Sequence, residues 1–136
     1  MLMLRVILLL YIFFCIYTGL RRDDTASDVE YIVKKVLNLR VFEADGQRWR
    51  TSVKDANLEV LCVSQFTLFA TLKGNKPDFH LSMGGDPAKA MYADFLQKMK
   101  ESYVNDRIKD GRFGEYMQVQ IENDGPVTIT LDSRND

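Results

Sequence analysis

Apolar residues recur at helical spacing in two stretches of the chain, and each stretch predicts an amphipathic helix. The first helix is predicted to begin at a cap formed by Asp24 or Thr25. Its apolar positions are Val29, Ile32, Val33, Val36 and Leu37. The second is predicted to begin at Asp86-Pro87, a cap followed by a proline at the first helical position. Its stripe consists of Met91, Tyr92, Phe95, Leu96, Met99 and Tyr103. Both stripes indicate faces that pack on a core rather than on a cofactor.

Runs rich in β-branched and aromatic residues predict the strands. We expect a hairpin from residues 39–42 and 49–53 around a turn at Asp45-Gly46, and two further strands at 117–122 and 127–131. The longest β-prone run, 58–70, is apolar nearly throughout, which is typical of a strand buried on both faces. Two helices combined with these strands predict a mixed α/β (α+β) domain.

Residues 1–20 contain only Arg5 as a charge, and residues 6–17 are an unbroken run of apolar and aromatic residues. This pattern fits the core of a signal peptide or a membrane anchor, since a spanning helix needs about 20 apolar residues. It also fits a buried strand. The pattern alone leaves both interpretations open.

Composition narrows the classes of function. A chain of 136 residues with a net charge of −1 forms one domain without the basic excess that long nucleic acid requires, so an RNA partner would be held over a short length, such as a single-stranded end. Cys15 and Cys62 lie in apolar runs, which predicts buried free thiols. With His80 as its single histidine, the chain offers little for a metal cluster or a Ser-His-Asp relay.

Three stretches with polar groups are candidates for a catalytic or binding site. Residues 64–67 contain two hydroxyl groups with no evident histidine to activate them, so a structural role competes with a nucleophilic one. The basic loop 72–77 is either a solvated turn or a contact for terminal RNA phosphates. Gly125-Pro126 is either a tight turn between two strands or, because X-Pro bonds adopt cis at low cost, a polar site built from main chain.

Four segments considered together resemble the D-aminoacyl-tRNA deacylase family in order and spacing. They are Ser64-Gln65-Phe66-Thr67-Leu68-Phe69-Ala70, Lys73-Gly74-Asn75-Lys76-Pro77-Asp78-Phe79-His80, Phe113-Gly114-Glu115-Tyr116-Met117 and Asn123-Asp124-Gly125-Pro126-Val127-Thr128. The likeness extends from Cys15 to Asp132. It implies a mixed, barrel-like sheet with two main helices and a homodimer formed through the sheet.

The resemblance also bears on the amino end. Members of the family begin with two further strands that carry a Gln-Arg-Val run, and this chain has no room for both before the buried strand at Cys15. We therefore expect residues 1–14 to be an atypical hydrophobic segment and 15–136 to be the deacylase domain. The expected location is the cytoplasm, with no membrane association unless residues 1–17 anchor or export the protein.

The activity implied by the resemblance is hydrolysis of the ester bond of D-aminoacyl-tRNA, and of glycyl-tRNA mischarged on tRNA(Ala), without metal or cofactor. Ser64, Gln65, Phe66 and Thr67 would form the catalytic segment, and the 2′-hydroxyl of the terminal adenosine would assist cleavage. A cis Gly125-Pro126 turn would enter the site of the partner subunit and exclude L-amino acids. The alternative is an inactive or weakly active relative that binds the tRNA 3′ end.

The resemblance assigns the remaining contacts to the tRNA 3′ end. Phe113 and Met117 would pack against the terminal adenine, and Lys73 and Lys76 would hold phosphates. His80 matches a loop residue near the substrate, for which no chemistry is required.

Overall fold

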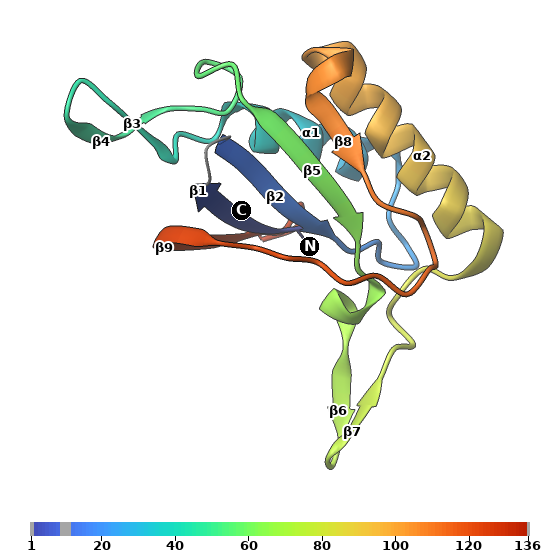
Figure 1. Ribbon diagram of the computed structural model, residues 1–136. Coiled ribbons are helices and arrows are strands. Elements are labelled where there is room, and N and C mark those ends of the chain that lie inside the picture. Colours follow the sequence, from blue (N-terminus) through green and yellow to red (C-terminus); the bar gives the residue numbers. More distant parts are fainter. Residues whose placement is uncertain (1, 9–11, 136) are drawn as a thin grey trace.

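The computed structural model describes residues 2–8 and 12–135. Their largest sheet is mixed and five-stranded, with both helices on the same side of it (Figure 1). The sheet order is β8-β5-β2-β1-β9. Its strands are β1 (Leu2–Leu8), β2 (Ile12–Thr18), β5 (Glu59–Ser64), β8 (Ile108–Asp110) and β9 (Asn123–Leu131). The helices are α1 (Ala26–Asn38) and α2 (Gly85–Ser102), with 3₁₀ turns η1 (Phe66–Phe69) and η2 (Asn105–Arg107). The predicted α/β class with two main helices is confirmed.

Two hairpins project from this body. One joins β3 (Phe42–Ala44) to β4 (Gln47–Thr51), and the other joins β6 (Thr71–Lys73) to β7 (Lys76–Asp78). They leave the body at different ends in Figure 1, the first beside the amino end of β5 and the second beyond its carboxyl end. Within the sheet, β2, β5 and β8 run parallel, whereas β1 is antiparallel to both β2 and β9.

Helix α1 follows the sequence prediction closely. Thr25 is its N-cap, and the backbone N–H of Thr25 donates to the Asp28 carboxylate at 2.9 Å. All five predicted apolar positions of α1 are buried. Helix α2 begins at Gly85 after an N-cap at Gly84, so the predicted cap at Asp86 and first helical residue at Pro87 are each two residues late.

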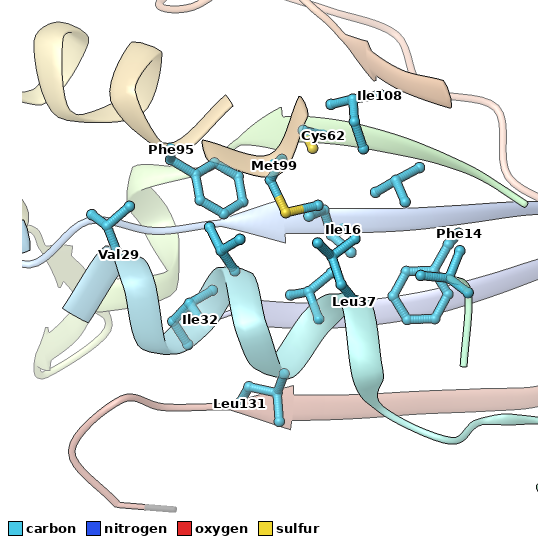
Figure 2. Packing of buried hydrophobic residues seen from close by; sticks show 14 of the residues in the cluster. Phe14, Ile16, Val29, Ile32, Leu37, Cys62, Phe95, Met99, Ile108 and Leu131 are labelled. Atoms are coloured by element: carbon cyan, nitrogen blue, oxygen red, sulfur yellow. The ribbon is translucent and has the colours of Figure 1, made fainter. Parts of the chain in front are cut away.

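The core lies between the helices and the sheet (Figure 2). Fully buried side chains from β2, β5 and both helices meet there: Phe14, Ile16, Cys62, Val36, Leu37, Phe95 and Met99. Cys15 and Cys62 are buried and not joined in a disulfide, as predicted. Burial raises the pKa of the Cys62 thiol far above its ordinary value, so this group is a packing element and not a nucleophile.

Several strand predictions are wrong in extent. The returning strand of the first hairpin is Gln47–Thr51 and not 49–53. The run 58–70 is a strand only to Ser64, after which η1 turns the chain away from the sheet. Residues 117–122 form no strand, and Gly125-Pro126 lies inside β9 instead of in a hairpin turn. The first hairpin strand begins at Phe42, because Leu39 is still the C-cap of α1. The basic loop 72–77 is the tip of the β6–β7 hairpin.

The hydrophobic amino end forms strands over residues 2–8 and 12–18, which confirms the strand interpretation for these residues. Phe14, Cys15 and Ile16 are fully buried at the centre of the sheet. Residues 1 and 9–11 of the predicted anchor segment lie outside the described residues. Among the residues described, no helix is long and apolar enough to cross a membrane. The domain boundary at residue 15 stays a prediction.

Candidate active site

A pocket of about 580 Å³ opens where β2 and β5 end. These strands are parallel, with Thr18 opposite Ser64, so their carboxyl ends reach the same edge of the sheet. The first turn of α2 and residues 113–119 complete the wall. A crevice outside the carboxyl ends of parallel strands is the usual ligand site of an open α/β sheet. The lining residues are Thr18, Leu20, Val63, Ser64, Gln65, Phe66, Phe79, Ser82, Met83, Gly84, Gly85, Ala88, Phe113, Gly114, Glu115, Tyr116, Met117 and Val119.

The turn after β5 explains how the first predicted segment reaches the pocket. The N–H of Gln65 donates to the Thr18 carbonyl at 2.8 Å, which is the last bond between the two strands. The chain then closes into η1, and this turn comes so near to Gly19 that a Cβ there would lie 2.9 Å from Leu68 Cβ. A glycine at position 19 therefore allows η1 to fold over the end of β2.

Ser64, Gln65 and Phe66 line the pocket, but Thr67 does not. The hydroxyl of Thr67 accepts a hydrogen bond from the Gln65 side-chain amide at 2.5 Å on the exposed side of η1. The Phe66 carbonyl accepts from the Ser82 hydroxyl at 2.7 Å, which ties η1 to the segment before α2. The structure thus brings three of the four predicted catalytic residues together and leaves the fourth at the rim.

The far wall is the segment of residues 111–122 between β8 and β9, here called the strap. Gly111 N–H donates to the Cys62 carbonyl at 3.3 Å, and Arg112 N–H approaches the Met117 sulfur at 3.4 Å. A Cβ at Gly111 would lie 2.7 Å from that sulfur, so only glycine leaves room for the Met117 side chain in this position. The strap holds Met117 in the pocket wall through these close contacts.

Phe113 is the second predicted strap residue in the pocket wall. Its ring packs against Tyr92 of α2, with ring centroids 5.6 Å apart. The Tyr92 hydroxyl donates to the Asp110 carboxylate at 2.7 Å, at the point where β8 gives way to the strap. Burial, together with this hydrogen bond, raises the pKa of Tyr92 far above its ordinary value. Tyr92 remains a neutral donor that links α2 to the base of the strap.

Lys73, Lys76 and His80 do not line the pocket. The lysines lie on the β6–β7 hairpin, where Lys73 pairs with Asp78 at 3.3 Å, and His80 also contacts the Asp78 carboxylate through Nδ1. The hydrogen bond from His80, followed by the contacts of Lys73, lowers the pKa of Asp78 to about 2. The hairpin is therefore a charged arm beside the pocket and not a part of its wall.

Gly125-Pro126 also lies outside the pocket of its own chain. Its peptide bond is cis, and both residues are exposed on β9. The pairing of β9 with β1 shifts register here, since Arg5 is opposite Thr128 but Ile7 is opposite Asn123. β9 therefore bulges outward at Gly125-Pro126.

Sequence reasoning missed several pocket residues. Thr18 is one, because its position opposite Ser64 depends on a parallel pairing between distant segments. Its hydroxyl oxygen is buried without a hydrogen-bond partner among the described groups. Phe79 is another: its ring meets Phe66 edge-on at 5.0 Å, although the two are 13 positions apart. Tyr116 is the third, and at 94% it is the most exposed aromatic residue of the wall. Only its position between the predicted site residues Phe113 and Met117 indicates that it belongs to the pocket.

Ionisable groups are scarce around the pocket. Of its lining residues, Glu115 and Tyr116 carry the ionisable side chains, and both are exposed. The described residues contain no group of three or more His, Cys, Asp or Glu side chains placed to hold a metal ion. The wall instead offers aromatic rings, hydroxyl groups and main chain, a composition suited to binding and orienting a ligand.

Comparisons with known proteins agree on one family. The family described as D-Tyr-tRNA(Tyr) deacylase matches residues 13–132. The D-aminoacyl-tRNA deacylase of Drosophila melanogaster is 60% identical over 119 residues, which cover 88% of this chain and 75% of that protein. D-aminoacyl-tRNA deacylase 1 of Homo sapiens is 53% identical over 120 residues, or 88% of this chain and 57% of the human protein. The chain thus spans little more than half the length of the human relative.

A solved structure agrees with these matches. The protein titled c-Myc DNA Unwinding Element Binding Protein superposes with a TM-score of 0.88 at 45% identity and covers 96% of both chains. The two chains therefore share the arrangement of the sheet and the two helices, including the strands that form the pocket.

Proposed function

Because the chain belongs to the D-Tyr-tRNA(Tyr) deacylase family, we propose that it hydrolyses the ester bond of D-aminoacyl-tRNA and releases free D-amino acid and tRNA. Water adds to the ester carbonyl, the bond to the ribose oxygen breaks, and that oxygen leaves as a hydroxyl. The pocket at the ends of β2 and β5 is the proposed site of this reaction. The reaction would take place in the cytoplasm, where charged tRNA is used.

The pocket wall is the single observation that carries this proposal. It brings Ser64, Gln65 and Phe66 into one cavity with Phe113 and Met117, from segments about 50 residues apart. A cavity of about 580 Å³ is within the usual range for small-ligand sites, about 300–1,000 Å³. We infer that the terminal adenosine and its amino acid occupy it.

Adenine would lie against the Phe113 ring and the Met117 thioether. Stacking of a base on an aromatic ring contributes about 1–3 kcal/mol and tolerates any base. Tyr92 supports Phe113 from behind, so the ring presents a fixed face. Exposed Lys73 and Lys76 on the neighbouring hairpin would contact phosphates that precede the adenosine.

The chemistry would rely on the substrate's own ribose. Thr67 lies outside the pocket and Ser64 has no histidine beside it, so neither hydroxyl has the base that a covalent route requires. The 2′-hydroxyl next to the ester can assist hydrolysis once the pocket orients it. Backbone N–H groups near Phe66 and Thr67 would stabilise the oxyanion that develops on the ester carbonyl.

Selection for D-amino acids would require a second copy of the chain. Gly125-Pro126 is exposed and lies outside its own pocket, so we propose that it enters the pocket of the partner in a homodimer. Exposed Phe66, Phe79 and Tyr116 surround the pocket mouth and provide apolar surface for such a contact. Main chain at Gly125 would receive the α-ammonium group, and an L side chain would collide with the wall. Glycine has no side chain, which extends the proposal to glycyl-tRNA mischarged on tRNA(Ala).

Incubation of the purified protein with D-tyrosyl-tRNA and with L-tyrosyl-tRNA tests the activity. We expect release of tyrosine from the D-ester only. Release from both esters, or from neither, would contradict a chiral deacylase, and tight tRNA binding without release would favour the inactive relative. A terminal 2′-deoxyadenosine should slow release severely, and normal cleavage of that RNA would rule out assistance by the substrate.

The variant Gly125→Ala tests the role of the bulge in β9. Gly125 has φ +116°, a conformation that L residues rarely adopt, and an added Cβ would lie 3.2 Å from a Val127 methyl. We expect loss of D-tyrosyl-tRNA cleavage. Asn57→Ala is a matched control, since residue 57 also has positive φ (+59°) and is exposed, but lies before β5, at the opposite end of that strand from the pocket. Equal activity of the two variants would contradict the proposed role.

A further inference from the structure

The β3–β4 hairpin carries the chain's only tryptophan in an unusual backbone conformation. Trp49 has φ +61°, in the left-handed region where a bulky side chain is a rare outlier. It is also 53% exposed. Neither its conformation nor its exposure serves the core, so the presence of tryptophan here requires another explanation.

A bulge in the hairpin accounts for the conformation. Phe42 pairs with Thr51 and Ala44 pairs with Gln47, so the single residue Glu43 lies opposite Arg48, Trp49 and Arg50. Bulges of this kind re-aim side chains and commonly use glycine at the left-handed position. Trp49 takes that position, and its neighbours in the sequence, Arg48 and Arg50, are exposed as well.

The charges around the hairpin suit a polyanion. Residues 34–55 contain six Lys and Arg against three Asp and Glu, a net charge of +3 in a chain whose total is −1. Within the part of the chain that the structure describes, no ion pair joins Arg48 or Arg50 to a carboxylate. Lys34 and Lys54 line one shallow cavity between the helices, and Lys34 also lines the next one with Arg40. The two cavities share Lys34, although Glu30 also lines the first of them.

This surface lies at the other end of the sheet from the pocket. The hairpin leaves the body near the amino end of β5, whereas the pocket is at its carboxyl end (Figure 1). Six residues of strand place the two ends roughly 17–20 Å apart. A ligand that only fills the pocket does not extend that far, but a folded RNA does.

We propose that Arg48, Trp49 and Arg50 form a second RNA contact, which binds the body of the substrate tRNA while its 3′ end occupies the pocket. The ring of Trp49 stacks on an unpaired base or ribose, and the two guanidinium groups bind phosphates. The inference rests on the proposed function for the identity of the RNA. A second copy of the chain is the competing occupant, but two unpaired arginines favour phosphate over an apolar protein surface.

The single tryptophan provides a direct binding test that needs no activity. Titration with deacylated tRNA should quench the Trp49 fluorescence, whereas adenosine monophosphate, which is small enough to enter the pocket alone, should leave it unchanged. The quench should weaken as salt rises, because phosphate contacts release counterions. A fluorescence signal that tRNA does not alter would overturn the proposal even if the protein proves to be an active deacylase.

Kinetics of Trp49→Gly then separate a binding role from a structural one. Glycine adopts positive φ freely, so the thermal midpoint should stay the same or rise. KM for full-length D-tyrosyl-tRNA should increase roughly tenfold, as expected for one lost stacking contact. Both kcat and the KM for a D-tyrosylated 3′-terminal trinucleotide should be unchanged. A loss of stability, or an equal effect on both substrates, would contradict the proposal.

The charges are tested by Arg48→Gln/Arg50→Gln. This variant should reduce the slope of log KM against log salt by about two, one for each phosphate contact. The control Lys89→Gln/Lys109→Gln removes two exposed charges from α2 and β8 and should preserve the slope. Equal slopes for both double variants would contradict the assignment. A change of oligomeric state in Trp49→Gly, measured by sedimentation, would instead assign the hairpin to a protein contact.

Discussion

Tyr92 is the residue through which helix α2 controls the strap. Its hydroxyl is buried and donates to the Asp110 carboxylate at 2.7 Å, immediately before the strap begins. The variant Tyr92→Phe removes this hydrogen bond and keeps the ring that packs on Phe113. We expect a strap that opens more often, with a weaker adenine wall as the consequence.

The size of the effect follows from the burial of the two partners. Hydrogen bonds to charged groups contribute about 1.5–3 kcal/mol, but the Asp110 carboxylate is exposed and recovers water when the hydroxyl is lost. The loss is therefore nearer about 1 kcal/mol. For 136 residues this lowers the thermal midpoint by about 3–4 °C. The rise in KM should be at most about fivefold, which corresponds to about 1 kcal/mol. Opening of the strap cannot weaken substrate binding by more than the free energy lost with the hydrogen bond.

Tyr103→Phe is the matched control. The Tyr103 hydroxyl donates to the Leu58 carbonyl at 2.9 Å, just beyond the opposite end of α2, so its loss should cost similar stability without changing KM. Amide hydrogen exchange of residues 111–122 should accelerate in Tyr92→Phe beyond the change in Tyr103→Phe. If both variants raise KM equally, or if Tyr92→Phe changes neither KM nor strap exchange, the proposed link between α2 and the pocket is wrong.

Three further predictions concern the rim, the strap and the charged hairpin. Gly111→Ala should displace Met117 from the pocket wall and raise KM several-fold at unchanged kcat, which steady-state kinetics would show. Thr67→Ala should alter the deacylation rate only mildly, since its hydroxyl lies outside the pocket; a loss of more than about a hundredfold would restore the covalent route. His80 lowers the pKa of Asp78 to about 2, so this carboxylate stabilises the fold above its unfolded pKa of about 4 and ceases to do so as pH falls through about 2. The thermal midpoint of Asp78→Asn should therefore lie below that of the unmodified protein at pH 6 and converge with it near pH 2.

The sequence predicts best those helices and strands that are fixed by residues within a few positions of one another. The cap at Asp24 or Thr25 and five apolar positions predict helix α1, because helical spacing and capping are properties of adjacent turns. The strand at Glu59–Ser64 was expected for the same reason, but its end was not. The apolar run continues past Ser64, and only the bond from Gln65 to the Thr18 carbonyl marks where η1 begins. That bond joins segments about 50 positions apart and leaves no local signal.

The strap shows a second limit. Residues 117–122 alternate apolar and polar positions in the manner of a strand, and that alternation is real. Met117 and Val119 line the pocket, however. The apolar residues therefore recur at every second position because this segment lies across a cavity and turns alternate side chains toward it. Periodicity reports that one side is buried, but it does not distinguish a sheet ladder from a pocket wall.

The amino-terminal strand connects these observations to the candidate site. Strand β1 pairs with β9 on both sides of Gly125-Pro126, since Arg5 lies opposite Thr128 and Ile7 lies opposite Asn123. The bulge is therefore held at both ends by β1, whose sequence is apolar at nearly every position and shows no pattern that would identify its partner. A strand in this position needs backbone hydrogen bonds to its neighbours and one buried face, and many apolar sequences satisfy both requirements. Hence the position of Gly125-Pro126 depends on a long-range pairing with β1, which the uniformly apolar sequence of that strand does not signal.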